Sequence, residues 1–263
     1  MRATIAYCPA SSNYCRSLSD FSDIEGVDPI QTVSLSFFRF DRVSARLWVL
    51  GQMALARLSL AKMPEARFWK LCGSGTGEGF TPVPNTAVWA ILVVWPDRET
   101  AERETSNASL FRRWRAKASE NWTVFLAPTS VRGHWSGATP FEAGAERNPG
   151  PLAALTRATI KPSILARFWG RVPDISTVIG ADPNVAFKIG IGEVPWLHQV
   201  TFSIWPDARA MDAFARGGPH AQAIRAVRQE GWFREELYAR FSVTGAKGTW
   251  GGTCPLRNLE RAP

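Results

Sequence analysis

The chain contains an internal repeat that is marked by one tripeptide. Trp95-Pro96-Asp97 recurs as Trp205-Pro206-Asp207, and a second tryptophan stands 27 residues beyond the first one in each copy, as Trp122 and Trp232. A repeat of this length predicts two copies of one supersecondary unit, stacked so that together they bury a common core. The repeat also supplies an internal comparison, because a residue that differs between the copies is a candidate for function.

Each copy has the pattern strand, helix, strand, strand, helix, strand. Runs of Leu, Ala and Arg without proline indicate the helices, and short β-branched and aromatic runs indicate the strands. In the first copy we expect these elements at residues 33–40, 43–62, 65–71, 87–95, 97–117 and 122–127. In the second copy we expect them at residues 153–160, 162–170, 185–191, 197–205, 207–228 and 232–243. Asp97 is a plausible N-cap for the helix that follows the tripeptide.

This element order is the ferredoxin-like plan, βαββαβ. Two such sheets that bury their bare faces against each other form a fused dimeric α+β barrel, which is the α+β architecture we predict. The first ferredoxin-like half is expected over residues 31–137 and the second over residues 152–252, joined by a linker at 138–151. Residues 1–30 are expected to be a disordered extension, and residues 253–263 a tail.

The amino-acid composition indicates which classes of partner the protein can bind. The net charge of +8 on 263 residues favours acidic partners, such as phospholipid headgroups, nucleic acid or an acidic protein. The 12 Trp and 15 Phe provide unusually large apolar side chains. No apolar run is long enough to cross a bilayer as a helix, and no secretory signal is recognisable. The four cysteines lack metal spacing and framework density, which predicts a reducing compartment.

One position carries a histidine in the second copy alone. An ungapped match of the copies places His220 opposite Leu110, directly after Gly217-Gly218-Pro219, where a helix can break or approach a ligand closely. This imidazole is a candidate axial ligand for haem iron, and a histidine bonded to backbone at a helix kink is the alternative. His198 is the rival ligand, because strand alternation directs it into a cavity or the core. His134, next to a loop glycine, is expected to be exposed.

The glycine cluster Gly73–Gly79 does not match a nucleotide-binding loop, because its spacing is wrong and no Gly-Lys-Ser/Thr follows. Pro82-Val83-Pro84 comes next, so no helix N-terminus is available to hold a phosphate. We interpret the cluster as a rim loop between the second and third strands. Cys72 is a weaker candidate for a thiolate ligand to haem. No nucleophile triad and no metal cluster emerges from the sequence.

Two segments that we expect to be helical have side chains typical of surfaces that bind a protein or a membrane. Arg112, Arg113, Arg115 and Lys117 end the first helix after the tripeptide. The simplest interpretation is that these four cations lie on a solvated helix face. The more specific one is that they dock to an acidic electron-transfer protein or to phospholipid headgroups. The helix at 43–62 combines leucines with cations, which is compatible with a helix that lies on a membrane surface. Core packing explains its leucines equally well.

Several longer stretches of the sequence are specific enough to indicate a protein family. They include Phe68-Trp69-Lys70 with Gly73 to Thr86, Arg171 to Ser176, Asp182 to Gly190, His198-Gln199-Val200-Thr201-Phe202-Ser203-Ile204-Trp205-Pro206-Asp207, and Gly218-Pro219-His220-Ala221-Gln222 with Trp232 to Tyr238. These stretches resemble the spheroidene monooxygenase family of carotenoid biosynthesis. The resemblance covers roughly residues 31–245 in long unbroken segments.

The resemblance implies an acyclic carotenoid 2-ketolase that converts spheroidene to spheroidenone with haem, dioxygen and reduced ferredoxin. On this hypothesis His220 binds the haem iron, and His198, Lys188 and Glu193 are candidates for the polar group on the distal side. The protein would be cytoplasmic and peripheral at the photosynthetic or inner membrane. A non-catalytic haem- or lipid-binding protein on the same barrel is the alternative. A nucleic-acid binder is disfavoured, because the aromatic sheet signature of RNA-binding ferredoxin-like domains is absent.

Overall fold

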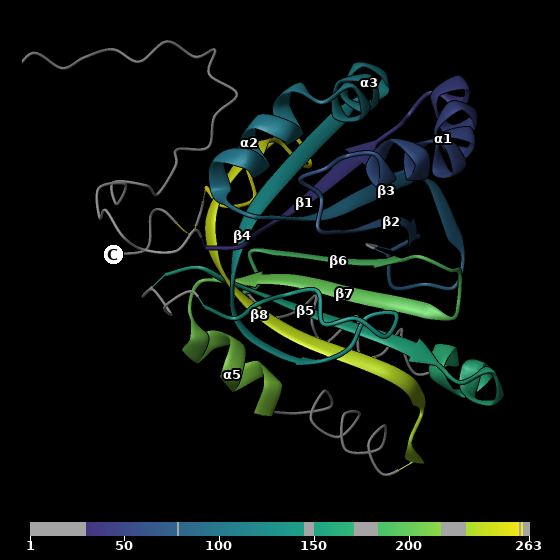
Figure 1. Ribbon diagram of the computed structural model, residues 1–263. Coiled ribbons are helices and arrows are strands. Elements are labelled where there is room, and N and C mark those ends of the chain that lie inside the picture. Colours follow the sequence, from purple (N-terminus) through teal and green to yellow (C-terminus); the bar gives the residue numbers. More distant parts are fainter. Residues whose placement is uncertain are drawn as a thin grey trace, which may run out of the picture.

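The computed structural model describes residues 30–77, 79–144, 150–170, 184–216, 230–257 and 259. Within them the strands close into a barrel in the order β1-β3-β2-β6-β7-β5-β8-β4. All neighbouring strands in this barrel are antiparallel. The helices lie outside it, and Figure 1 shows α1, α2 and α3 above the barrel and α5 below it.

The two halves repeat one topology. The first consists of β1 (Thr32–Arg39), α1 (Val43–Ala61), β2 (Phe68–Gly75), β3 (Pro84–Trp95), α2 (Arg98–Asn107), α3 (Ser109–Lys117) and β4 (Glu120–Gly133). The second consists of β5 (Leu152–Ile160), the 3-10 helix η1 (Pro162–Ile164), β6 (Phe187–Gly192), β7 (His198–Trp205), α5 (Ala208–Arg216) and β8 (Phe233–Gly248). The halves meet where β2 pairs with β6 and β4 pairs with β8. The predicted α+β barrel of two ferredoxin-like repeats is confirmed.

The Trp-Pro-Asp tripeptide performs the same local task in both halves. The Asp97 carboxylate accepts a hydrogen bond from the backbone N–H of Thr100 at 2.7 Å, which confirms it as the N-cap of α2. Asp207 accepts from the N–H of Ala210 at 2.8 Å. The preceding tryptophans, Trp95 and Trp205, are buried at the ends of β3 and β7. The repeat therefore fixes each turn from strand to helix.

The helix after the first Trp-Pro-Asp differs from the sequence prediction. The single helix expected at 97–117 is two helices, because Ala108 adopts an extended conformation between α2 and α3. The Ser106-Asn107 pair favours such a break, since short polar side chains compete with the helical backbone. The Arg115 guanidinium donates to the carbonyls of Thr105 and Ser106 and so satisfies the C-terminal end of α2.

The last strand of each half is longer than predicted. β4 and β8 extend past the expected ends at 127 and 243, because they pair with each other across the junction of the halves. In the second half, the segment expected as a helix at 162–170 begins as η1 and is helical over residues 165–170. The expected helix at 207–228 is described only as α5, and residues 217–229 lie outside the described residues.

The barrel interior is a packed apolar core rather than a channel. It is formed by alternate residues of the strands, including Phe37, Trp122 and Phe202. Phe141, from the predicted linker, and Leu256, from the predicted tail, are also buried in it. A second apolar layer packs the outer face of the first sheet against α1, α2 and α3. No described helix combines the length and apolar character needed to cross a bilayer.

Strand register corrects the ungapped match of the copies. Trp95 pairs with Thr32 as Trp205 pairs with Leu152, so β1 and β5 can be superposed residue by residue. Phe37 then corresponds to Arg157, and their partners on the last strands are Trp122 and Leu237. Trp122 therefore corresponds to Leu237 and not to Trp232.

The interval from the tripeptide tryptophan to this position is 27 residues in the first half and 32 in the second, so the second half holds five additional residues. The ungapped match therefore fails by the start of β8. His220, which it places opposite Leu110, lies outside the described residues, so their opposition stays a prediction. The register also aligns the second strands of the two halves residue by residue. Phe68 pairs with Val94 as Phe187 pairs with Ile204, so Phe68 corresponds to Phe187.

Candidate functional site

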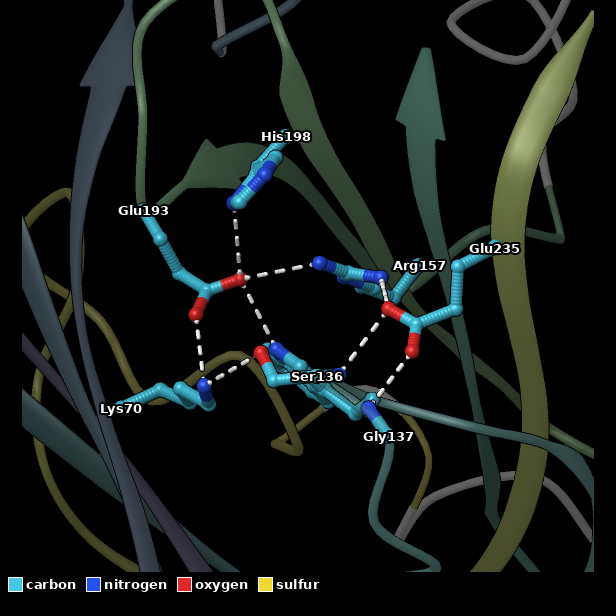
Figure 2. Close-up of polar contacts among 8 residues, drawn as sticks. Lys70, Ser136, Gly137, Arg157, Glu193, His198 and Glu235 are labelled. Atoms are coloured by element: carbon cyan, nitrogen blue, oxygen red, sulfur yellow. Dashed lines mark hydrogen bonds and ion pairs between the residues drawn. The ribbon is translucent and has the colours of Figure 1, made fainter. Parts of the chain in front are cut away.

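A network of charged side chains occupies one end of the barrel interior. Lys70, Arg157, His198 and Glu235 continue the every-second positions of their strands that carry the apolar core, so they point inward. Glu193 follows β6 and joins them from the loop before β7. Figure 2 shows the five side chains converging from four strands and this loop. Far-apart parts of the sequence thus form one polar cluster.

Glu193 is the centre of the network. Its carboxylate accepts hydrogen bonds from the indole N–H of Trp135 at 2.8 Å and lies 2.8 Å from the ammonium of Lys70. The Arg157 guanidinium lies 3.6 Å from the same carboxylate, and His198 Nδ1 lies 3.4 Å from it. Arg157 is 1% exposed. One carboxylate therefore balances two cations in a largely buried setting.

Glu235 connects the network to the hairpin turn after β4. It accepts from the backbone N–H groups of Ser136 at 2.9 Å and Gly137 at 2.6 Å, and it pairs with the Arg157 guanidinium. Although burial alone would raise the pKa of Glu235, these two N–H donors and Arg157 lower it below its usual range. The bonds fix the turn so that the Trp135 ring closes this end of the core.

Burial shifts the pKa values of His198 and Cys72, and the charges of the network modify both shifts. Burial lowers the pKa of His198; Glu193 opposes this effect, whereas Arg157 and Lys70 reinforce it. Burial also raises the pKa of the Cys72 thiol far above its usual range, and Glu193 adds to the increase. The Cys72 side chain lies within the apolar core of the barrel interior, and its role as a thiolate ligand stays a prediction.

This environment predicts acid sensitivity. The folded-state pKa of His198 lies below the ordinary value of 6.5, so its contribution to stability is fully present above that pH. The contribution is lost as the pH falls, because the unfolded chain binds a proton that the folded chain resists. Between about pH 7.5 and about pH 5.5, urea denaturation should show a larger loss of unfolding free energy for the native protein than for His198→Gln. Equal losses would contradict the assignment.

The pseudo-symmetry of the barrel sets this end apart. With the corrected register, Arg157 corresponds to Phe37, Lys70 to Ile189 and His198 to Val88. The opposite end is accordingly apolar, with the rings of Phe37, Trp122 and Phe187 in mutual contact. Glu235 is the exception, because its counterpart Glu120 binds an equivalent turn through the N–H groups of Gly251 and Gly252. The inward cations and the histidine therefore lie at one end of the barrel and have no charged counterparts at the other.

We call β1–β4 the first sheet of the barrel and β5–β8 the second. The outer faces of these two sheets differ even more than the two ends of the interior. In the first sheet the outward positions carry bulky apolar side chains, which pack under the helices: Phe38, Trp69, Leu71, Trp89, Ile91, Val93 and Phe125. The corresponding positions of the second sheet are small or polar: Ala158, Lys188, Gly190, Gln199, Thr201, Ser203 and Arg240. The amide nitrogen of Gln199 is buried and has no hydrogen-bond partner within the described part of the chain. This surface, which we call the second-half face, is suited to a polar ligand rather than to helix packing alone.

The second-half face is bordered by structured elements. Trp205 packs against Met211 and Phe214 of α5 at one side. At another side the rim loop after β2 approaches so closely that a Cβ on Gly190 would lie 2.5 Å from the carbonyl oxygen of Gly79. Gly79 has φ +91°, so glycine is required there for its backbone as well. The glycine cluster is thus a rim loop, as predicted, and it touches the second half.

A cavity of about 470 Å³ lies elsewhere, between α2–α3 and the junction of β4 and β8. The charged groups that line it already have partners. Arg115 binds the end of α2, Lys247 lies 2.9 Å from Glu102, and Glu120 lies 3.1 Å from Arg39. Its charged side chains are therefore already engaged, and we place the candidate site on the second half instead.

The predicted site residues have different locations. His198 and Glu193 come together in the interior network, whereas Lys188 lies on the opposite side of the sheet, on the second-half face. His134 is exposed, as predicted. Sequence reasoning missed Arg157, Lys70 and Glu235, together with Gln199. Comparing the copies in the correct register would have indicated the cations, since each replaces an apolar residue of the other half.

Comparison with solved structures defines the class of fold. An aldoxime dehydratase in complex with butyraldoxime matches with a TM-score of 0.58 at 10% identity, over 90% of this chain and 88% of that chain. A second aldoxime dehydratase structure matches with a TM-score of 0.56 at 11% identity, over 95% and 97% of the chains. At such low identity the likeness shows the fold, a tandem ferredoxin-like barrel, and no more.

Sequence comparison defines the family. The chain is 56% identical over 230 residues to spheroidene monooxygenase of Cereibacter sphaeroides, covering 86% of this chain and 71% of the relative. It is 55% identical over 234 residues to that of Rhodobacter capsulatus, covering 87% and 97%, and 34% identical over 209 residues to that of Rubrivivax gelatinosus, covering 80% and 81%. No family model matches the chain. The chain belongs to the spheroidene monooxygenase family and is an oxidoreductase of the monooxygenase type.

Proposed function

We propose that the protein is a haem-dependent monooxygenase that introduces a keto group at C2 of acyclic carotenoids, converting spheroidene to spheroidenone. Dioxygen is the oxidant and reduced ferredoxin the electron donor. Family membership supports the substrate class. The observation that supports haem as the cofactor comes from the second-half face. There, small and polar side chains replace the large apolar side chains of the first sheet. A carotenoid substrate also favours a cytoplasmic protein held peripherally at the membrane that contains it.

The residues of the second-half face fit a haem group. Ala158 and Thr201 are smaller than Phe38 and Ile91, which hold the corresponding positions in the first half, and this difference would suit a flat macrocycle above the sheet. The unpaired amide of Gln199 offers a hydrogen-bond donor in a buried place. His220, four residues after the end of α5 in the sequence, would supply the axial nitrogen. Lys188 stands on the same face, which keeps it as the distal candidate.

When bound, the haem would supply the activation of dioxygen. Two successive hydroxylations at C2 each consume one O₂, two electrons and two protons and release one water. The resulting geminal diol then loses water to give the ketone. The chain must therefore deliver four protons to a dry site. Lys188 would hold and transfer protons at the face, Gln199 would donate a hydrogen bond that orients the reacting groups, and the closely packed rim loop at Gly79 would limit the access of water.

His198 and Glu193 have a different part in this proposal. Their side chains lie on the interior side of the sheet, so they would act through the strands they stabilise rather than by touching a ligand on the second-half face. A neutral His198 next to Glu193 holds the start of β7, the strand that carries Gln199 and Thr201. We therefore assign both of them to positioning the face.

The electron donor would dock on cationic side chains. Arg112, Arg113 and Lys117 are exposed at the end of α3, whereas Arg115 is engaged with the carbonyls of α2. An acidic ferredoxin is attracted to such a surface, mainly through a faster encounter that is sensitive to salt. Three of the four cations at the end of α3 would therefore contribute to docking.

An absorption spectrum of the purified protein, recorded with and without dithionite, tests the cofactor. We expect a Soret band that shifts on reduction. Turnover with spheroidene, dioxygen and reduced ferredoxin separates the monooxygenase from a non-catalytic haem- or lipid-binding protein on the same barrel. A protein that converts spheroidene without absorbing in the Soret region would contradict the haem assignment while retaining the activity.

Filling the second-half face tests its location. The double variant Ala158→Phe with Thr201→Ile installs counterparts of Phe38 and Ile91 from the first half. We expect haem affinity to fall at least about tenfold, because losing roughly 1.4 kcal/mol of contacts suffices for that. The apoprotein should still unfold cooperatively. Val200→Ile, an interior change on the same strand, serves as the control and should keep its haem. Unchanged haem content in the double variant would place the cofactor elsewhere.

A further inference from the structure

Helix α1 is apolar on two opposite sides. Its inner side, with Ala45, Val49, Ala56 and Leu60, is buried against the first sheet. Its outer side is also apolar, yet it faces solvent: Leu47 is 65% exposed and Leu58 is 62% exposed. A helix that is apolar all round is normally buried all round. The outer side therefore lacks a partner among the described residues.

The exposed apolar residues form one continuous stripe, which we call the α1 stripe: Val43, Leu47, Leu50, Ala54, Leu55 and Leu58. Most of these positions are three or four residues apart, so their side chains line a single face. The helix has 19 residues and is therefore about 28 Å long. An apolar strip of this length is much more than the single exposed leucines that any surface carries.

Cations flank the α1 stripe. Arg42 and Lys62 stand exposed at its two ends, and Arg57 is exposed beside it. The helix itself contains no acidic residue, and the nearest ones, Asp41 and Glu65, lie beyond its ends. An apolar face bordered by exposed cations is complementary to the interface of an anionic bilayer, where acyl chains lie under negatively charged headgroups.

We propose that the α1 stripe docks the protein on the surface of an anionic membrane, with α1 lying in the plane of the interface. The leucines enter the boundary between headgroups and acyl chains, and Arg42, Arg57 and Lys62 contact the phosphates. A second copy of the chain is a poorer occupant, because two such stripes placed face to face bring the two sets of cations together. The inference deepens the proposed function, since a long apolar carotenoid resides in the bilayer.

Vesicle binding tests the inference without any need for turnover. The native protein should co-sediment with vesicles of phosphatidylcholine containing about 30% phosphatidylglycerol and bind pure phosphatidylcholine more weakly. The variant Leu47→Glu with Leu58→Glu should bind the anionic vesicles at least about tenfold more weakly. Val83→Glu, at an exposed apolar residue outside α1, is the matched control and should bind like the native protein. Unchanged vesicle binding of the α1 variant would overturn the proposal.

Two further measurements separate the outcomes. If the α1 variant turns a dimer into a monomer while vesicle binding is unchanged, the stripe is an interface between copies and the proposal is wrong. With carotenoid supplied in vesicles, the α1 variant should lose most of its turnover, whereas turnover with detergent-dispersed carotenoid should be unchanged. If neither form of carotenoid is converted by the native protein, the proposed function fails, and α1-dependent vesicle binding still stands by itself.

Discussion

His220→Ala should abolish the Soret band and the conversion of spheroidene. An axial ligand contributes directly to the binding of the iron, so its removal should reduce haem affinity by more than the roughly 10–100-fold that loss of an outer-shell partner typically causes. As the proposed ligand, this imidazole would also set the electronic character of the haem iron. Haem content per protein and turnover with reduced ferredoxin provide the two measurements. Added imidazole should restore part of the absorbance, because it can occupy the vacated position.

The other two histidines are the controls for this prediction. His134→Ala removes an exposed imidazole and should leave spectrum and turnover unchanged. His198→Ala removes an interior imidazole and should lower stability while the Soret position stays the same. If His220→Ala keeps bound haem with an unaltered spectrum, another residue is the ligand. A spectral change in His198→Ala alone would favour the rival histidine.

The architecture could be predicted because it depends on features that one sequence displays. The doubled Trp-Pro-Asp marks the same strand-to-helix turn twice, and its aspartates cap their helices in both halves. The element order then requires two sheets whose apolar faces meet, and the closed barrel follows from that requirement. Boundaries that depend on pairing between the halves, such as the ends of β4 and β8, could not be predicted from local pattern.

The site was harder to predict, because it depends on register. Phe-Trp-Lys at 68–70 resembles Ala-Phe-Lys at 186–188, yet Lys70 points inward and Lys188 points outward, and the counterpart of Lys70 is Ile189. A slip of one residue exchanges the two faces of a strand. The five additional residues before β8 had the same effect on the last strand, and they separated the counterparts Glu120 and Glu235. The charged network emerges only when the strands are compared in their paired register.

Glu193→Gln should destabilise the protein by about 3–5 kcal/mol, the usual effect of breaking a buried ion pair. The substitution leaves the ammonium of Lys70 and part of the Arg157 charge without a counterion in a place that water barely reaches. Glu102→Gln is the matched control. Glu102 also contacts two cations, Arg98 and Lys247, but its side chain is 32% exposed, so we expect a loss of about 1 kcal/mol or less. Urea denaturation of both variants gives the comparison.

A triple variant shows whether the network exists for stability. Lys70→Ile, Arg157→Phe and Glu193→Ser together copy the apolar end of the barrel, where Ile189, Phe37 and Ser74 hold the corresponding positions. Replacing buried ion pairs by uncharged residues is often neutral or stabilising, and Glu235 keeps the N–H donors of Ser136 and Gly137, so the triple variant should be more stable than Glu193→Gln. If it folds well and has lost turnover, the charges serve the second-half face and not the fold. If Glu193→Gln unfolds within about 1 kcal/mol of the native protein, its carboxylate is not the counterion that the geometry indicates.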